Sequence, residues 1–108
     1  MINGDPMAEP IILKDYIQYS PQSVVSKTLK QNPAGTITLF AFDAGQGLSE
    51  HSAPFDAVVQ VIEGDGVFTV GGKEYNLKAG QFIIMPANVP HAVKASGKFK
   101  MLLTMLRA

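Results

Sequence analysis

The sequence predicts an all-β domain built as a sandwich or barrel of antiparallel strands. Short β-rich runs follow one another at intervals of about ten residues, a spacing typical of such folds. Turn-forming residues separate the runs, and no stretch has a helical period long enough for a major helix. Because 46% of the 108 residues are hydrophobic and 17% are charged, the chain has the apolar content of one folded domain.

The chain divides into a lead-in segment, residues 1–22, and a barrel domain, residues 23–108. Prolines, a glycine and acidic residues with no hydrophobic period predict that residues 1–10 are loosely docked. Residues 11–17 are expected to form a short helical turn or an irregular strand, which the Ser20-Pro21 step ends. The strands are predicted at residues 23–29, 36–42, 57–63, 67–70, 74–77, 81–85, 91–94 and 99–106.

Glycine-containing pairs between the runs predict tight hairpin turns. Asp65-Gly66 and Gly71-Gly72 each stand between β-rich runs, and such pairs supply the positive φ angles that tight hairpins need. Residues 32–35 and 86–90 are predicted to be longer loops, because their prolines cannot donate a hydrogen bond to a neighbouring strand.

Composition and charge exclude several classes of protein. Nine Lys and Arg balance nine Asp and Glu, so the chain lacks the basic excess that binds nucleic acid or an anionic membrane, and we expect neither partner. The absence of Cys excludes a disulfide framework, a thiolate metal site and a Cys nucleophile. No apolar stretch has the length of a membrane span, and the first residues lack the pattern of a signal peptide, so we expect a cytoplasmic protein.

The two histidines, His51 and His91, are the strongest candidates for a functional site. Each stands at the edge of an expected strand, beside a turn rich in Gly or Pro. A lone histidine in such a place is commonly a hydrogen-bonded structural residue.

Regularly spaced Gly, Pro and His residues mark two segments, with Gly45, His51 and Gly64 in the first and Gly80, Pro86 and His91 in the second. These segments resemble the two motifs of the cupin superfamily, G-xxxxx-H-x-H-xxx-E-xxxxxx-G and G-xxxxx-P-x-G-xx-H-xxx-N. With the flanking strands the resemblance covers residues 23–106. It implies a small single-domain cupin, whose fold is a double-stranded β-helix (jelly-roll) barrel of two antiparallel sheets. It also implies that the rings of His51 and His91 approach each other inside the barrel.

The departures from the motifs bear on metal binding. In metal-bearing cupins the first motif supplies two His and one Glu, and the resemblance places Ala53 and Ala57 at two of these three positions. Only His51 and His91 remain, whereas a catalytic first-row metal usually has three protein ligands. Asp56 is a weak third candidate, because alternation along a strand turns it away from the side to which Ala57 points. The implied site is degenerate, so we expect no cofactor and at most weak binding of divalent Ni, Zn, Mn or Fe.

The small side chains of Ala53 and Ala57 predict a cavity that is wider and more apolar than in metal-bearing relatives, which favours an organic ligand. His51 and His91 are the polar groups expected to orient it, by binding a carboxylate or a sugar hydroxyl. Val59 continues the inward-facing set after Ala57, and a methionine offers an adaptable apolar wall. The alternative to a ligand-binding role is, for each apolar residue, a purely structural role in the hydrophobic core. The predicted ligand-binding set is His51, His91, Ala53, Ala57, Val59 and Met101.

Three functions remain open from the sequence. The first is a small-molecule-binding protein with little or no bound metal. The second is a metal-dependent enzyme of the dioxygenase, isomerase or decarboxylase type, completed by a ligand outside the motifs. The third is a non-catalytic accessory or sensor domain. We also expect a homodimer, because zero net charge removes repulsion between protomers and the apolar run at residues 99–106 suits β-mediated pairing.

Overall fold

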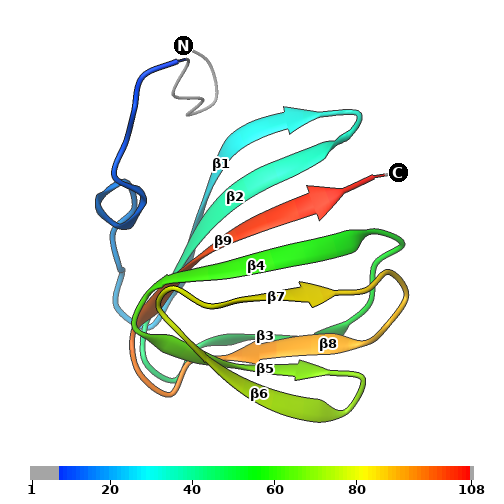
Figure 1. Cartoon of the computed structure of the whole chain (residues 1–108). Coiled ribbons are helices and arrows are strands. Elements are labelled where there is room, and N and C mark those ends of the chain that lie inside the picture. Colours follow the sequence, from blue (N-terminus) through cyan, green and yellow to red (C-terminus); the bar gives the residue numbers. More distant parts are fainter. Residues whose placement is uncertain (1–7, 108) are drawn as a thin grey trace.

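Two antiparallel sheets face each other in the computed structural model, which describes residues 8–107 (Figure 1). The five-stranded sheet has the order β1-β2-β9-β4-β7, and the four-stranded sheet has the order β3-β8-β5-β6. This is the predicted jelly-roll barrel. The elements are η1 (Leu13–Asp15), β1 (Val24–Asn32), β2 (Gly35–Phe42), β3 (Gly47–His51), β4 (Asp56–Glu63), β5 (Asp65–Val70), β6 (Lys73–Lys78), β7 (Phe82–Met85), β8 (His91–Lys94) and β9 (Phe99–Leu106).

The strand that sequence reasoning missed is β3. It lies at the outer side of the four-stranded sheet, and four of its five residues are exposed. An outer strand with little buried surface has no hydrophobic alternation to reveal it. The predicted loop at residues 32–35 is also wrong, because β1 and β2 form a hairpin in which Asn32 pairs with Gly35.

The predicted hairpin at Asp65-Gly66 is wrong as well. β4 pairs with β7 and β9, whereas β5 pairs with β6 and β8, so β4 and β5 belong to different sheets. Gly64 turns the chain from one sheet to the other with a φ of 71°, and a Cβ there would lie 2.3 Å from the carbonyl oxygen of Lys98. Both the positive φ and this close approach require glycine. The hairpin predicted at Gly71-Gly72 is confirmed between β5 and β6.

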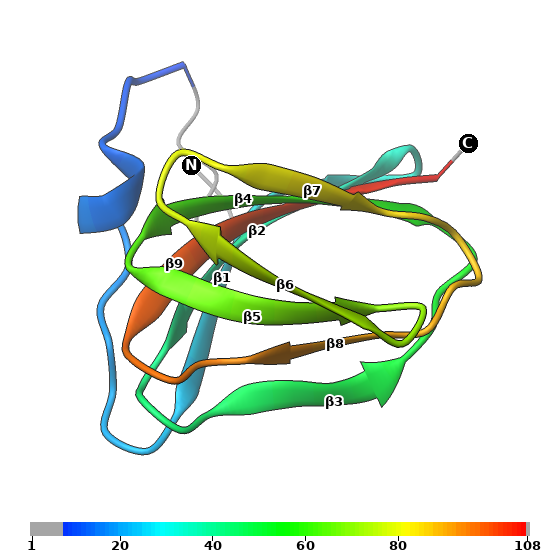
Figure 2. The same cartoon turned by 60° about the horizontal axis from the view of Figure 1, so that its bottom comes forward.

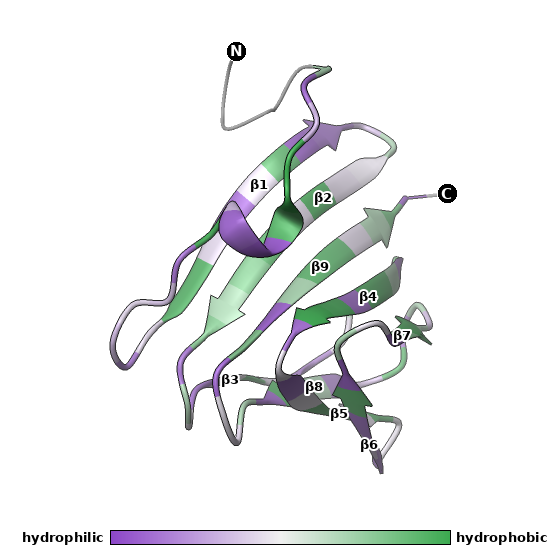
Figure 3. Ribbon diagram, turned by 60° about the vertical axis from the view of Figure 1, so that its left-hand side comes forward, coloured by the Kyte–Doolittle hydropathy of each residue, from purple (hydrophilic) through white to green (hydrophobic). Residues whose placement is uncertain are grey.

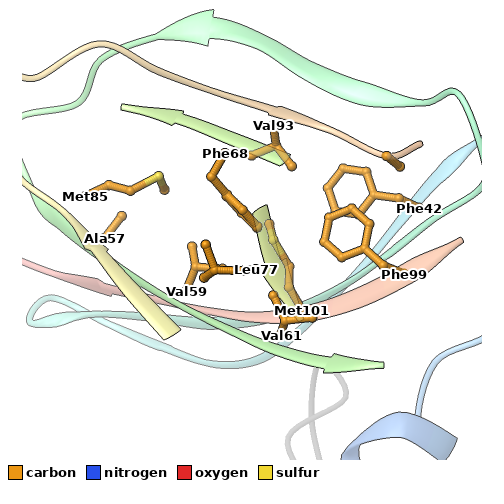
Figure 4. Close-up of a cluster of buried hydrophobic side chains, with 11 residues drawn as sticks. Phe42, Ala57, Val59, Val61, Phe68, Leu77, Met85, Val93, Phe99 and Met101 are labelled. Carbon is orange, nitrogen blue, oxygen red and sulfur yellow. The ribbon is translucent and has the colours of Figure 1, made fainter. Parts of the chain in front are cut away.

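Buried side chains from both sheets fill the barrel (Figure 4). At one end Phe42 and Phe99 stack with ring centroids 4.6 Å apart, and Phe68 meets Phe99 edge to face at 6.0 Å. Ala57 and Met85 lie at the opposite end, as Figure 4 shows. The aromatic end is therefore packed with large rings, whereas the other end carries smaller and more flexible side chains.

The segment that precedes β1 covers the outer face of the five-stranded sheet. Residues 13–15 form the 3-10 helix η1, in agreement with the expected helical turn, and η1 contacts β4 from the outer side of the sheet, toward the viewer in Figure 3. Buried Ile17 packs with Leu39 and Ala41, so this segment forms a second apolar cluster outside the barrel. Of the lead-in expected to be loosely docked, residues 1–7 lie outside the described part of the chain.

A polar cluster fixes this segment to the sheet. The Lys100 side chain, 5% exposed, donates to the carbonyl oxygen of Lys14 and lies 3.6 Å from a carboxylate oxygen of Glu63. The Tyr19 hydroxyl donates to the same oxygen of Glu63 at 2.5 Å, and the Lys100 ammonium lies 4.8 Å from the Tyr19 ring centroid. Burial and the Glu63 carboxylate raise the pKa of the Tyr19 phenol, so Tyr19 stays a donor.

Glu63→Ala is expected to cost more stability than Lys100→Met. Without Glu63, the buried ammonium of Lys100 loses its carboxylate, which should lower the free energy of unfolding by about 2 kcal/mol. Lys100→Met removes the charge and keeps an apolar chain of similar length, so we expect a change within about 1 kcal/mol. Urea denaturation of both variants measures the difference, and equal losses would contradict this role for the ion pair.

The position of β9 corrects the expected mode of dimerisation through residues 99–106. β9 lies between β2 and β4, so both of its hydrogen-bonding edges are used within the chain. Residues 99–106 therefore cannot pair with a second copy through strand edges. The outer strands are β1 and β7 in one sheet and β3 and β6 in the other. Within residues 8–107, no helix is both long and apolar enough to span a membrane.

Candidate functional site

Strand pairing brings the two histidines together. His51 ends β3, His91 begins β8, and the two residues are direct partners in the antiparallel β3–β8 pair. Directly opposite residues present their side chains to the same face of a sheet. The Nε2 atoms lie 3.1 Å apart, and the ring centroids lie 4.4 Å apart with an interplanar angle of 72°. The predicted approach of the two rings is confirmed.

Backbone carbonyls fix the tautomer of both rings. His51 Nδ1 lies 2.8 Å from the carbonyl oxygen of Ser49, and His91 Nδ1 lies 3.2 Å from that of Val89. A carbonyl oxygen can only accept a hydrogen bond, so each Nδ1 carries a proton and donates it. In a neutral ring the Nε2 atom is then a bare acceptor. Two bare acceptors face each other across 3.1 Å, and a proton, a ligand donor or a cation must join them.

The environment of His91 opposes its protonation. His91 is 5% exposed, whereas His51 is exposed at the end of its strand. Burial, and then the nearby charge of His51, lower the pKa of His91, while the hydrogen bond to Val89 acts weakly in the opposite sense. The surroundings of His91 therefore favour its neutral form, in which the Nε2 atom accepts.

This shift predicts a loss of stability on acidification. In the unfolded chain the imidazole of His91 takes up a proton near pH 6.5, whereas the folded chain resists protonation until a lower pH. The stability contributed by His91 is thus complete above about pH 6.5 and falls as the pH drops through the folded pKa. Thermal melting between pH 8 and pH 5 should show this decline, and His91→Asn, which keeps a donor for the Val89 carbonyl, should flatten it. A parallel decline in the variant would assign the effect to other groups.

A small cavity lies behind the histidine pair. Its volume is about 50 Å³, and it opens at the end of the barrel where the β3–β4 and β7–β8 loops lie side by side (Figure 2). Apart from the histidines, its walls are apolar. The lining residues are Leu48, His51, Ala53, Ala57, Met85, His91, Val93, Met101, Leu103 and Met105.

The predicted ligand-binding set matches this wall with one exception. Ala53, Ala57 and Met101 line the cavity with the histidines, whereas Val59 is fully buried in the core and is not part of the wall. The cavity is apolar, as expected, but its volume is well below the roughly 300–1,000 Å³ typical of small-molecule pockets. Five further lining residues lie outside the predicted set, because their strands could not be placed in register: Leu48, Met85, Val93, Leu103 and Met105.

Two methionines flank Ala57, the position at which the cupin motif has Glu. Ala57 on β4 is paired with Met85 on β7 and with Met105 on β9, so the three residues form one row across the five-stranded sheet. All three line the cavity. Where the motif has a carboxylate, this chain therefore has the methyl group of Ala57, and the thioether side chains of Met85 and Met105 lie on either side of it.

The donor set does not fit the metal site of metal-bearing cupins. Asp56 is exposed at the start of β4, accepts a hydrogen bond from the Ala87 N–H at 2.9 Å, and is not part of the cavity wall. Among residues 8–107, no group of three or more His, Cys, Asp or Glu side chains could hold a metal ion. Two imidazoles alone are fewer than the three protein ligands that such a site needs.

Backbone contacts brace the loops around the cavity mouth. The Asn88 N–H donates to the carbonyl oxygen of Ala53 at 2.7 Å, which ties the β7–β8 loop to the β3–β4 loop. Asn88 has a φ of 65° at the position where the second motif usually has Gly, a conformation that Asn tolerates. A wider groove of about 520 Å³ lies elsewhere, over Val67, Thr69 and Lys94 of the four-stranded sheet, and neither histidine lines it.

Comparisons with known proteins place the fold in a family. Residues 38–106 match the family model described as a cupin domain. A conserved protein of unknown function from Streptococcus pyogenes is 34% identical, with a TM-score of 0.92, and the match covers 98% of this chain and 93% of that one. A cupin superfamily protein from Desulfitobacterium hafniense is 28% identical, with a TM-score of 0.90, and the match covers 97% of this chain and 96% of that one. A cupin 2 conserved barrel domain protein from Leptotrichia buccalis is 38% identical, with a TM-score of 0.85, over 88% of this chain and 46% of that one. No curated protein sequence matches the chain.

Proposed function

Since the chain belongs to the cupin family, we propose that it is a ligand-binding cupin that holds a small hydroxyl-bearing organic molecule at the His51–His91 pair. The observation that carries this proposal is the pair of Nε2 atoms 3.1 Å apart, each on a ring whose Nδ1 donates to a backbone carbonyl. Such a pair accepts hydrogen bonds, and a hydroxyl group donates them. The sequence left two ligand groups open, a carboxylate and a sugar hydroxyl. The tautomers of the two rings favour the hydroxyl, because a carboxylate has no proton to donate to them.

The dimensions of the site limit how the ligand binds. A cavity of about 50 Å³ takes a hydroxyl group and one or two carbon atoms, so the rest of the molecule lies outside, beside exposed His51. Apolar walls accept the carbon atoms, and the imidazoles set the orientation. With one or two new hydrogen bonds of about 1 kcal/mol each, we expect a dissociation constant of about 30 to 200 mM for a simple alcohol.

Nuclear magnetic resonance tests this proposal directly, because the chain has two histidines and therefore two imidazole Cε1–H signals. At pH 8 we expect ethylene glycol, glycerol and glucose to shift both signals saturably, and acetate to leave them unchanged. His51→Gln should abolish the shift of the His91 signal. Glu50→Gln, at the exposed neighbouring position, is the matched control and should bind as the unmodified protein does.

Two results would contradict the proposed function. Saturable shifts with acetate and none with the alcohols would show that the pair binds anions. Alcohol binding that survives His51→Gln would place the ligand elsewhere, and the wide groove over the four-stranded sheet would be the next site to examine.

We also propose that the protein is a cytoplasmic homodimer that associates through the outer face of β7. Phe82 and Ile84 are 63% and 53% exposed there, and with zero net charge two copies do not repel each other. Light scattering should give twice the 11.6 kDa mass of the chain. Phe82→Lys with Ile84→Lys should reduce the mass to that of a monomer, whereas Tyr75→Lys, on the other sheet, should not. A monomer at high protein concentration would contradict the proposal.

A further inference from the structure

We infer that the cavity behind the histidine pair is a binding site for a soft monovalent metal ion, Cu(I), held by His51, His91 and the thioethers of Met85 and Met105. The inference rests on the proposed function in one respect, that the His51–His91 pair is where ligands bind. It concerns a set of donors in which methionine sulfur takes the place of the carboxylate and the third imidazole.

The histidine pair has the geometry of two metal ligands. The Nε2 atoms are 3.1 Å apart, and with metal–nitrogen bonds of about 2.0 Å this separation gives an N–metal–N angle of about 100°. Metal-ligating histidines commonly donate their other ring N–H to a backbone carbonyl, as His51 does to Ser49 and His91 does to Val89. A cation between the bare acceptors also removes the repulsion between their lone pairs.

The rest of the wall selects the kind of metal. Met85 and Met105 lie on either side of Ala57 in one row of the sheet, and both line the same cavity as the imidazoles. Thioethers are soft ligands that select Cu(I), whereas Mg, Ca and Mn need carboxylate, carbonyl or water oxygens. Within the described residues no carboxylate joins the pair, so harder divalent ions lack the ligands that they prefer.

The size and polarity of the cavity agree with a single ion. A space of about 50 Å³ holds one metal ion, and it is small for any but the shortest organic group. The remaining walls are apolar, and an ion of single charge costs less to desolvate in such surroundings than a divalent ion. His91 is almost fully buried, so the inner ligand is already fixed before the metal arrives.

The test uses Cu(I) itself, supplied under reducing, oxygen-free conditions, in competition with a chromophoric Cu(I) chelator. We expect one Cu(I) per chain, and no binding of Zn(II), Ni(II) or Mn(II) at micromolar concentration. His51→Gln should weaken Cu(I) binding by about a hundredfold or more, and Met85→Leu with Met105→Leu by at least about tenfold. The matched control is Ile83→Leu, on the same strand as Met85 but not part of the cavity wall, and it should change affinity by less than about threefold.

A second measurement identifies the sulfur ligands without chelators. With methionines labelled at the methyl carbon, Ag(I) as an air-stable substitute should shift the Met85 and Met105 methyl signals more than that of Met101, which also lines the cavity but is paired with Val61 rather than with Ala57. Failure to bind Cu(I) and Ag(I) while alcohols still shift the histidine signals would overturn this inference alone. Cu(I) affinity equal to that of the unmodified protein in the Met85→Leu, Met105→Leu variant would likewise overturn it.

Discussion

Ala53→His combined with Ala57→Glu is expected to create tight binding of Ni(II), Zn(II) or Mn(II). The unmodified chain should bind these divalent ions weakly or not at all, because it offers two imidazoles and no carboxylate. Both alanines line the cavity that His51 and His91 close, so the substitutions add an imidazole and a carboxylate to a wall that already carries two ligands. We expect a gain in affinity of at least about a thousandfold, equivalent to about 4 kcal/mol, measured by calorimetry with Ni(II).

Matched variants separate ligation from packing. The new side chains have to fit a cavity of about 50 Å³, so the metal-free double variant should melt at a lower temperature than the unmodified protein, and Ni(II) should restore it. The single changes should give intermediate affinities, and His91→Ala should abolish the gain. Ala57→Gln in place of Ala57→Glu keeps the size without the charge and should bind Ni(II) poorly. Stoichiometric divalent metal in the unmodified chain that survives chelation and is lost in His51→Ala would contradict this account.

Phe99→Ala is expected to be among the most damaging single substitutions, with a loss of about 4 kcal/mol in the free energy of unfolding. Phe99 is fully buried, stacks on Phe42 and meets the edge of Phe68. Removing its ring opens a cavity at the aromatic end of the barrel and leaves both neighbours without their partner. Chemical denaturation measures the loss, and a change below about 1 kcal/mol would show that the barrel collapses around the gap.

Gly66, on β5 of the opposite sheet, provides a second test of how the Phe99 ring is packed. A Cβ on Gly66 would lie 2.6 Å from Cζ of Phe99, and the three nearest atoms all belong to that ring. Gly66→Ala alone should cost about 2 kcal/mol through overpacking. In a Phe99→Leu background the obstructing ring atoms are gone, so the two changes should together cost less than the sum of their separate effects by at least about 1 kcal/mol. Strict additivity would show that Gly66 is needed for a reason other than space.

The repeating β-rich runs and the spacing of the two motifs were enough to predict the jelly-roll barrel and the approach of His51 to His91. Both depend on features that a sequence displays, hydrophobic alternation and fixed positions of Gly, Pro and His. β3 escaped because a mostly exposed outer strand has no such alternation. The turn at Asp65-Gly66 was misjudged because a glycine that turns the chain between two sheets has the same local pattern as one in a hairpin.

The wall of the candidate site was harder to predict than its histidines. Whether Met85 and Met105 both lie beside Ala57 depends on the register of three strands, and two of these are far from β4 in the sequence. A shift of one residue in either pairing would turn the methionine to the outer face. Val59 was placed on the correct face, but it is not part of the cavity wall, because the extent of the cavity depends on how neighbouring side chains fill the barrel.

The place of β9 between β2 and β4 has a consequence for biosynthesis. On the ribosome, the first eight strands emerge before residues 99–106, yet the middle of the larger sheet cannot close without that final strand. Until then, β2 and β4 each expose an unpaired edge, which invites association with other nascent chains. Such non-local pairing also predicts slow folding for a chain of this size. We therefore expect the nascent chain to remain protease-sensitive until β9 has left the exit tunnel.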